Sequence, residues 1–408
     1  APPQERQAIS KLERRRTMPS ASFNPLVCRL SPPPVPSVFA WGRAYDGASG
    51  PLIDLSQAVP GYPPHPDMLA WLGEAAASRA TAGYGPIEGE DVLRGTYAEE
   101  MAETYGAPVT ATNIHITSGC NQAFMAAVMA IAGAGDRVAL TDPFYFNQET
   151  TLAMLGIGRE LLPLDAADGF VPRLERVREV LARGVKAIAL VTPNNPTGAV
   201  YPGPLLKDIF ELCRAAGAWL ILDETYRDFL PAGERPHELL SAPAWEENLI
   251  LLYSFSKSFC IPGHRLGAVT AGERTVAEIA KVMDNLQICA PRAPQVAVAR
   301  AIPALKPWRN ANSTEILARA AALRAVMARL PAWEMDSLGA YFAFIRHPFG
   351  DLASAEIAEM LARKAGVLCL PGAYFGERQE TYLRFAFANA DAATIATLAD
   401  RLGGFTPA

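Results

Sequence analysis

From Asn113 to about Ala290, apolar runs of strand length alternate with helical segments. Runs such as Ala187–Val191 and Trp219–Leu222 are apolar at every position, which is typical of strands buried on both faces of a parallel sheet. The pattern therefore predicts an α/β fold whose mostly parallel seven-stranded sheet is flanked by helices. The predicted strands are Ile114–Thr117, Arg137–Thr141, Glu160–Leu164, Lys186–Thr192, Trp219–Asp223, Leu249–Tyr253 and Leu266–Thr270.

A second, shorter stretch of alternating strands and helices follows a predicted connecting helix over Glu315–Ala328. Its predicted strands are Tyr341–Ile345, Val367–Leu370 and Tyr382–Ala386, separated by helices over 355–365 and 391–402. A chain of 408 residues also exceeds the size at which one hydrophobic core stops growing. We therefore expect a large domain over residues 61–300 and a smaller α/β C-terminal domain over 301–408.

The N-terminal part of the chain has a different pattern. Residues 19–51 are rich in proline, as in Ser31–Pro36, and show neither helical nor strand periodicity. They are predicted to form an extended N-terminal arm, within a segment 19–60 that also contributes to the small domain. Residues 1–18 contain the basic cluster Lys11–Arg16 and are interpreted as a solvated tail that need not be ordered, with a fragment of a targeting segment as the alternative.

Composition narrows the possible functions. The net charge of −5 and pI near 5.7 give no electrostatic reason to expect a nucleic acid or an anionic membrane as partner. No uncharged apolar run reaches the roughly 20 residues that a membrane-spanning helix needs. The six cysteines and five histidines are dispersed, which argues against a disulfide scaffold or a metal site. A reducing, cytoplasmic location fits best, with no metal.

The polar residues that end the predicted strands carry the candidate chemistry, because ligands of open α/β sheets bind beyond the carboxyl ends of the strands. Lys257 follows an apolar strand and is flanked by Ser254 and Ser256. It is either a lysine that reaches water at a strand end or a desolvated amine whose lowered pKa suits a Schiff base. Arg265, between two glycines, suits a phosphate group.

Three further motifs follow other strands. Asp223 ends an apolar strand and begins Asp223-Glu-Thr-Tyr226, so it is either a helix N-cap or the partner of a buried cation. Asn195 lies in an Asn-Pro-Thr-Gly segment that is a turn by composition. The Thr117-Ser-Gly-Cys-Asn121 segment joins a strand to an apolar helix, whose free N–H groups can hold a phosphate.

In this order and spacing, the motifs resemble the class I/II aminotransferases, which are pyridoxal 5'-phosphate (PLP) enzymes of fold type I in the aspartate aminotransferase superfamily. The resemblance extends from about Tyr84 to Arg384. It implies PLP as cofactor and the transfer of an amino group between an L-amino acid and a 2-oxo acid.

The resemblance also implies a role for each residue. Lys257 would hold PLP as a Schiff base and move the proton, Asp223 would pair with the pyridine nitrogen, and Asn195 and Tyr226 would contact the phenolate oxygen. Tyr145 would stack on the ring, and Arg384, with Asn195, would bind the substrate carboxylate. Tyr84 is similar to a tyrosine that reaches the neighbouring subunit's phosphate, which implies a homodimer with shared sites. The expected phosphate ligands are Ser118, Gly119, Cys120, Ser254, Ser256 and Arg265.

The choice of substrate stays open at this point. Aromatic and apolar residues in Val38–Trp41 and Gln57–Tyr62 favour an aromatic or large neutral donor, although packing explains them equally well. Arg292 is either a ligand for a second carboxylate, as in aspartate-type enzymes, or a surface arginine. Relatives with the same fold include C–S β-lyases. A PLP-sensing regulator is disfavoured because residues 1–60 are too short and proline-rich for a DNA-binding domain and its linker.

Overall fold

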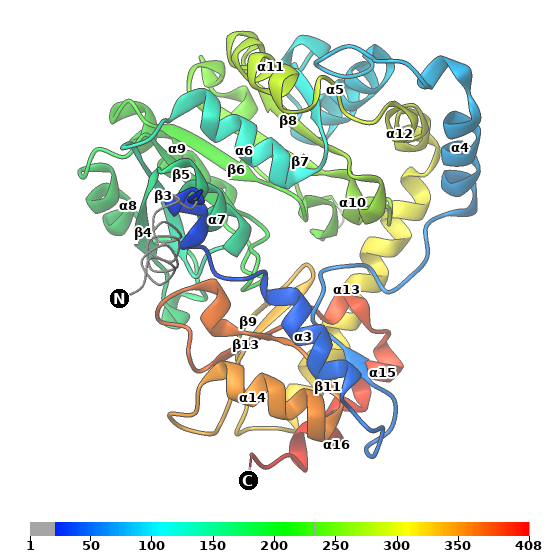
Figure 1. The fold of residues 1–408 in the computed structure, drawn as a ribbon, viewed down its shortest axis with the longest axis vertical. Coiled ribbons are helices and arrows are strands. Elements are labelled where there is room, and N and C mark those ends of the chain that lie inside the picture. Colours follow the sequence, from blue (N-terminus) through cyan, green and yellow to red (C-terminus); the bar gives the residue numbers. More distant parts are fainter. Residues whose placement is uncertain (1–20, 232, 408) are drawn as a thin grey trace, which may run out of the picture.

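The computed structural model describes residues 21–231 and 233–407, so the predicted tail 1–18 lies outside the described residues. Two units lie one above the other in Figure 1, and the lower unit combines residues from the N-terminal and C-terminal parts of the described chain. The upper unit is built on a seven-stranded sheet of order β2-β8-β7-β6-β5-β3-β4. All its strands are parallel except β8, which is antiparallel to both neighbours. The strands are β2 (Ile114–Thr117), β3 (Arg137–Asp142), β4 (Gly158–Pro163), β5 (Ala187–Val191), β6 (Trp219–Asp223), β7 (Leu249–Ser254) and β8 (Gly267–Ala271).

Both faces of this sheet are buried, as the apolar strands predict. On β5, Ala187 and Ala189 pack with one group of helices, while Ile188 and Leu190 belong to the core on the other face. The first face is covered by α6 (Cys120–Ile131), α7 (Phe146–Leu155) and α11 (Glu273–Gln287). The second is covered by α5 (Asp91–Tyr105), α8 (Leu174–Leu181), α9 (Gly203–Ala215) and α12 (Arg292–Ala304), with α4 (Pro66–Ala77) packed outside. The predicted fold class is therefore confirmed.

The lower unit contains a four-stranded antiparallel sheet of order β12-β13-β10-β9 and a parallel pair, β1 with β11. Its helices are α14 (Ser354–Met360), α15 (Ala392–Ala396) and α16 (Leu398–Gly403), with a single π-turn at Leu361–Ala365. The strands are β1 (Ile53–Asp54), β9 (Glu334–Gly339), β10 (Phe342–Arg346), β11 (Val367–Leu368), β12 (Leu370–Pro371) and β13 (Tyr382–Phe385). Its separate apolar core agrees with the expected smaller C-terminal α/β domain.

The connecting helix is longer than predicted. Helix α13 runs over Lys306–Ala328 and begins nine residues before the expected Glu315. Its first turns contain Asn, Ser and Thr, whose low helix propensity hid them in the sequence. Tertiary contacts hold these turns, since Arg309 pairs with Glu100 of α5 and Trp308 packs on the core of the large unit.

The N-terminal arm is present, but the prediction that it is extended and without helix is wrong. Helix α2 (Pro25–Cys28) lies beside α7, and α3 (Pro34–Arg43) packs on β11 of the small unit. Both helices carry proline in the first turn. Proline is tolerated there because backbone N–H groups of the first turn have no hydrogen-bond partner within the helix. Val38 and Gly42 on α3 are buried, so packing stabilises a helix that the proline content obscured.

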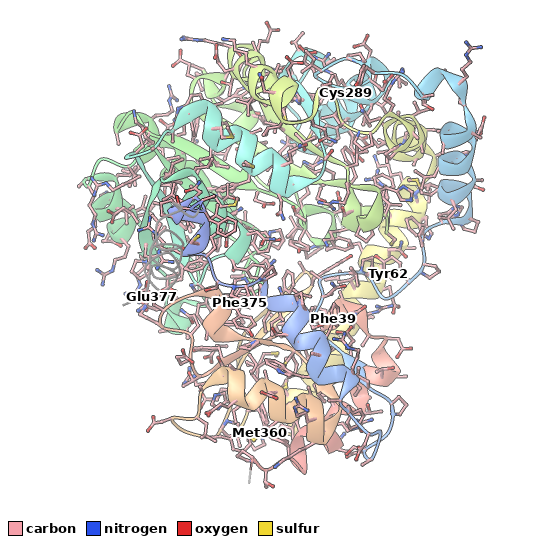
Figure 2. The ribbon with its side chains drawn as sticks, in the orientation of Figure 1. Phe39, Tyr62, Cys289, Met360, Phe375 and Glu377 are labelled. Carbon is pink, nitrogen blue, oxygen red and sulfur yellow. The ribbon has the colours of Figure 1, made fainter. Side chains whose placement is uncertain are left out.

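Among the contacts between the two units, two are particularly close or buried. Gly198, in the loop after β5, lies against Gly339 of β9, and a Cβ at Gly198 would overlap the backbone of Gly339 and Phe342. On the other side, buried Asp142 at the end of β3 accepts hydrogen bonds from Arg378 (3.2 Å) and Gln379 (3.1 Å) of the small unit. Figure 2 labels Phe375, next to this second contact, at the junction of the units.

The contact at Gly198 leads to a stability prediction. Gly198 has φ +79° and no space for a side chain, so Gly198→Ala should lower the free energy of unfolding by about 3 kcal/mol. Gly169→Ala is the matched control, because Gly169 has φ +61° but nothing near its Cβ position, and should cost about 1 kcal/mol. Urea unfolding of both variants tests the difference, and equal losses would contradict a close contact between the units.

Candidate active site

A cavity of about 1290 Å³ opens where the carboxyl ends of β5, β6 and β7 face the small unit. It is lined by residues from the large unit, from the small unit and from the N-terminal arm. Eight of the residues predicted from the sequence line it together: Cys120, Tyr145, Asn195, Asp223, Tyr226, Lys257, Arg265 and Arg384. Ser254 and Ser256 line it as well. The structure thus gathers side chains spread over more than 260 residues of sequence.

Lys257 lies on α10 (Phe255–Ser258), a single turn that follows β7 directly. The side chain of Ser254 caps this turn by accepting a hydrogen bond from the Ser256 N–H. The Lys257 amine donates to the carbonyl oxygen of Ala58 at 2.5 Å. Burial, together with the positive charges of Arg265 and Arg384, lowers the pKa of Lys257 to about 8. The amine therefore loses its proton far more readily than an ordinary lysine.

Asp223 ends β6 and is only 5% exposed. One carboxylate oxygen accepts from the N–H and hydroxyl of Thr225 (3.1 and 2.8 Å), and the other accepts from Gln148 (3.2 Å). Burial raises the pKa of Asp223, although these hydrogen bonds oppose the rise. In the described part of the chain, no lysine or arginine forms an ion pair with it. A buried carboxylate in this state is suited to a cationic ligand.

The part of the cavity beside Cys120 and Arg265 is suited to an anion. Gly119, with φ +89°, precedes α6, so the first N–H groups of that helix are free, and a Cβ at Gly119 would overlap the Arg265 guanidinium. Among the described residues, the buried hydroxyl of Ser256 has no hydrogen-bond partner. The hydroxyl of Ser118 points elsewhere, because it donates to Gln287 at 2.6 Å, and Ser118 does not line the cavity.

Two tyrosines and an asparagine line the middle of the cavity. Tyr226 packs edge-on against Phe342, and burial raises its pKa well above the ordinary value, so its hydroxyl keeps its proton and can donate. Tyr145 precedes α7, and its hydroxyl accepts from Asn147 at 2.8 Å. Asn195 accepts from Arg384 at 3.1 Å through its side-chain oxygen.

Arg384 is a buried cation that forms no ion pair with any of the described residues. It lies on β13, is 3% exposed, and its guanidinium sits between the rings of Phe342 (5.0 Å) and Phe375 (5.1 Å). It donates to Asn195 and to the carbonyl oxygen of Ser56, while its Nε has no partner among the described residues. Burial lowers its pKa to about 10. A carboxylate ligand would supply the missing negative charge and the missing hydrogen-bond acceptor.

Two residues predicted from the sequence lie away from the cavity of their own chain. Tyr84 is 80% exposed. Arg292, at the start of α12, pairs with Glu90 at 2.5 Å and donates to the carbonyl oxygens of Gly83 and Tyr84.

Several residues at this site were not predicted. Thr225 could have been found, since a hydroxyl two residues after an aspartate often binds it. Gln148 gave no sequence signal, because it reaches the site through tertiary structure. The same is true of the arm residues that line the cavity: Val27, Leu30–Val35 and Ser37. Ala58 lies in the singled-out segment Gln57–Tyr62, but the contact of its carbonyl oxygen with Lys257 was not predicted.

Comparison with known proteins supports the chemistry that this geometry allows. The sequence profile described as aminotransferase class I and II matches residues 50–402. The chain belongs to this family. It is 28% identical over 357 residues to an aromatic aminotransferase of Arabidopsis thaliana, a match that covers 86% of this chain and 88% of the relative. It is 26% identical to an aspartate aminotransferase of Pyrococcus horikoshii, covering 75% and 78%.

The fold is that of the solved aminotransferases. A Thermus thermophilus aspartate aminotransferase double mutant superposes with a TM-score of 0.86 at 23% identity, over 94% of this chain and 99% of that one. This chain is thus a PLP-dependent aminotransferase, which moves an amino group from an amino acid to a 2-oxo acid. The predictions of family, enzyme class and cofactor are confirmed. The site also fits PLP chemically, with an amine for its aldehyde, an acid for its ring nitrogen and an anion site at Gly119 and Arg265.

The lowered pKa of Lys257 can be measured directly. In the cofactor-free protein, acylation of Lys257 by a neutral reagent should rise with pH around a midpoint near 8, because burial and two arginines disfavour the protonated form. Arg384→Met removes one of these cations and should raise the midpoint, while Arg363→Met, on the remote π-turn, should not. Mass spectrometry of the labelled peptide gives the midpoint. A value near 10.5 would contradict a desolvated amine.

Proposed function

We propose that Lys257 carries the cofactor covalently and moves the proton of the reaction. When bound, PLP supplies a ring that stabilises negative charge at the substrate Cα. Lys257 has a suitable pKa near 8, so close to neutral pH it can both accept and donate a proton. Its amine lies in the same cavity as Asp223 and Arg384, which is the observation on which the proposal rests.

Asp223 is proposed to hold a proton on the ring nitrogen. A carboxylate and a cation about 4 Å apart attract each other by about 4 kcal/mol at an effective dielectric near 20. The three hydrogen bonds from Thr225 and Gln148 support the charged form of Asp223. These hydrogen bonds also fix the orientation of the Asp223 carboxylate in the cavity.

The remaining site residues are proposed to hold the cofactor and the substrate. Tyr226 and Asn195 would donate to the phenolate oxygen, and Tyr145 would stack on the ring. Arg384, with Asn195, would hold the substrate carboxylate and so orient the Cα–H bond for Lys257. The proposed phosphate ligands are Gly119 and Cys120 through their main chain, together with Ser118, Ser254, Ser256 and Arg265.

Reduction of the purified enzyme tests the covalent role. After growth with pyridoxine, borohydride treatment and digestion should leave a pyridoxyl group on the peptide that contains Lys257. Lys257→Ala should abolish the visible absorption band of the cofactor and all measurable turnover. Lys281→Ala, on the exposed side of α11, should keep both. A pyridoxyl group on another lysine would overturn the proposal.

An aromatic or large neutral amino acid is proposed as the donor. The cavity wall contains Leu30 and Pro32 from the arm, Phe144, Phe146 and Tyr374. Of the segments singled out in the sequence, Gln57, Ala58 and Val59 line the cavity, whereas Val38 is buried in the core of the small unit. The aromatic aminotransferase of Arabidopsis supports the same donor. The aspartate-type alternative has less support, because Glu90 already pairs with Arg292.

A donor panel tests this preference. With 2-oxoglutarate and with pyruvate as acceptors, kcat/KM for phenylalanine, tyrosine or tryptophan should exceed that for aspartate at least tenfold. The wall offers apolar surface, and its described cations are already proposed to hold PLP or the α-carboxylate, apart from Arg159, which pairs with Glu149 and Glu377. Keto acid should form only when an acceptor is present. Pyruvate and ammonia released from a cysteine conjugate would instead indicate a lyase, and a preference for aspartate would refute the donor assignment.

A cytoplasmic homodimer is proposed as the assembly. Tyr84 and a set of apolar side chains are exposed on α4, α5, α11, α12 and their flanks, namely Leu69, Val92, Leu286, Ile288 and Val296. A partner covering this face would bury them, and Tyr84 could then complete the partner's phosphate site. No helix in the described residues is long and apolar enough to cross a membrane. The proposed domains are a large one over residues 61–300 and a small one formed by residues 301–408 together with the N-terminal segment 19–60.

A further inference from the structure

A second group of buried charges lies behind Lys257, outside the cavity. Its central members lie within five residues of Asp223 in the chain: Glu224 and Arg227, which are buried, and Asp228, which is partly exposed. None of the three lines the cavity, and none has a role in the mechanism proposed above. Ionised side chains are seldom buried unless they are paired, so this group calls for a physical explanation.

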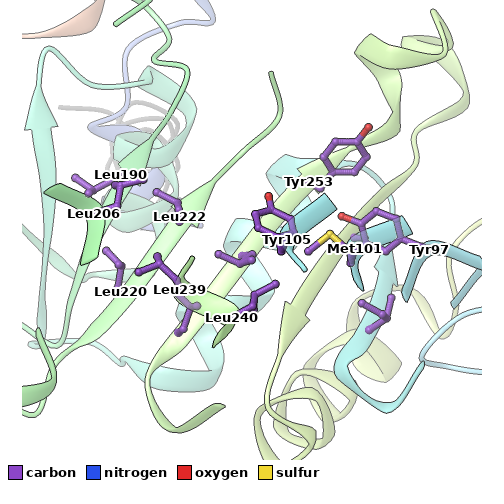
Figure 3. Close-up of a cluster of buried hydrophobic side chains, with 14 of the residues drawn as sticks. Tyr97, Met101, Tyr105, Leu190, Leu206, Leu220, Leu222, Leu239, Leu240 and Tyr253 are labelled. Carbon is purple, nitrogen blue, oxygen red and sulfur yellow. The ribbon is translucent and has the colours of Figure 1, made fainter. Parts of the chain in front are cut away.

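Arg227 is enclosed by three tyrosine rings. Its guanidinium carbon lies 4.1 Å from the ring centre of Tyr253, 5.5 Å from that of Tyr97 and 5.6 Å from that of Tyr105. Figure 3 shows these three rings grouped around Met101 in the core of the large unit. Glu224 and Asp228 lie 3.9 and 4.0 Å from the guanidinium nitrogens. The arginine is therefore fixed by aromatic faces and by two carboxylates.

Asp228 links this group to the turn that carries Lys257. One of its oxygens accepts hydrogen bonds from the hydroxyls of both Tyr253 and Ser258, which lie 2.9 Å from each other. Burial alone would raise the pKa of Asp228, but Arg227, Arg309 and these hydrogen bonds lower it below the usual value. Asp228 thus stays ionised, and a charged acceptor forms the stronger hydrogen bonds.

Helix α10 needs such an anchor because it is very short. Its four residues, Phe255–Ser258, form a single turn, and an isolated turn of helix has little stability of its own. Ser254 caps its beginning, and Ser258, the residue after Lys257, is tied to Asp228 at its end. Lys257 therefore lies between two fixed points.

We infer that Asp228 is a positioning residue for Lys257, acting through the hydroxyl of Ser258. The segment Asp223–Asp228 then sets three parts of the site at once, because Asp223 and Tyr226 face the cavity while Asp228 holds the lysine turn from behind. This inference rests on the proposed role of Lys257. It assigns the buried charges a function in geometry rather than in proton transfer.

A double-mutant cycle on the PLP-loaded enzyme tests this inference. Asp228→Asn and Ser258→Ala should each lower kcat about tenfold or more, with KM changed less than threefold, because the turn no longer holds the amine in its reactive position. Each should also lose at least half of the visible circular dichroism per bound cofactor. If Asp228 acts through Ser258, the double variant should be no worse than the more damaged single variant.

Glu100→Gln is the matched control. Glu100 pairs with Arg309 at the edge of the same ionic group, and in the described part of the chain no hydrogen bond or ion pair joins it to α10. This variant should lower the thermal unfolding midpoint while the dichroism per cofactor and kcat stay within twofold of wild type. Equal losses of dichroism and kcat in Glu100→Gln and Asp228→Asn would show that Asp228 contributes only to the stability of the fold, and would overturn the inference.

Other outcomes are equally decisive. Additive losses in the double variant, or unchanged dichroism and kcat in Asp228→Asn, would overturn the inference. If Asp228→Asn does not fold, Ser258→Ala decides alone, since unchanged dichroism and kcat in that variant overturn the inference and their loss supports it. Failure of the proposed function is distinguishable, because the wild-type enzyme would then carry its pyridoxyl group on a lysine other than Lys257.

Discussion

Removing a charged side chain from water is costly unless an opposite charge or several hydrogen bonds replace the lost solvation. Three such side chains meet in one cavity of this protein: Lys257, Asp223 and Arg384. Burial lowers the pKa of the lysine and of the arginine and raises that of the acid. Within residues 21–231 and 233–407, none of the three forms an ion pair. A ligand that supplies the opposite charges would therefore be both bound and oriented by these side chains.

The fold holds these three side chains in place by attaching them to strands or to a turn that directly follows a strand. Asp223 ends a strand in the middle of the sheet, and Arg384 lies on β13 between two neighbouring strands. Lys257 lies on the least regular support, a single turn. The hydrogen bonds at both ends of that turn are therefore as important to its geometry as the strand that precedes it.

The sequence predicted those features that local patterns determine. Continuous apolar runs located the strands of the large sheet. The motifs after those strands, with the family resemblance that they carry, identified ten of the residues that line the cavity. The helices of the arm were missed because proline content masked helices stabilised by packing of Val38 and Gly42. The contact of Ser118 with Gln287 and that of Gln148 with Asp223 join residues far apart in the chain, so no local pattern could reveal them.

The long helix α13 has a mechanical consequence. Its beginning is held by Glu100 of the large unit, and its later turns, with Leu323 and Val326, belong to the core of the small unit. A straight rod of 23 residues, about 35 Å long, transmits rotation and resists bending. Helix α13 therefore joins the two cores through a single continuous element, so the position of the small-unit core, and with it Arg384 on β13, is coupled to that of Arg309 and Glu100 in the large unit.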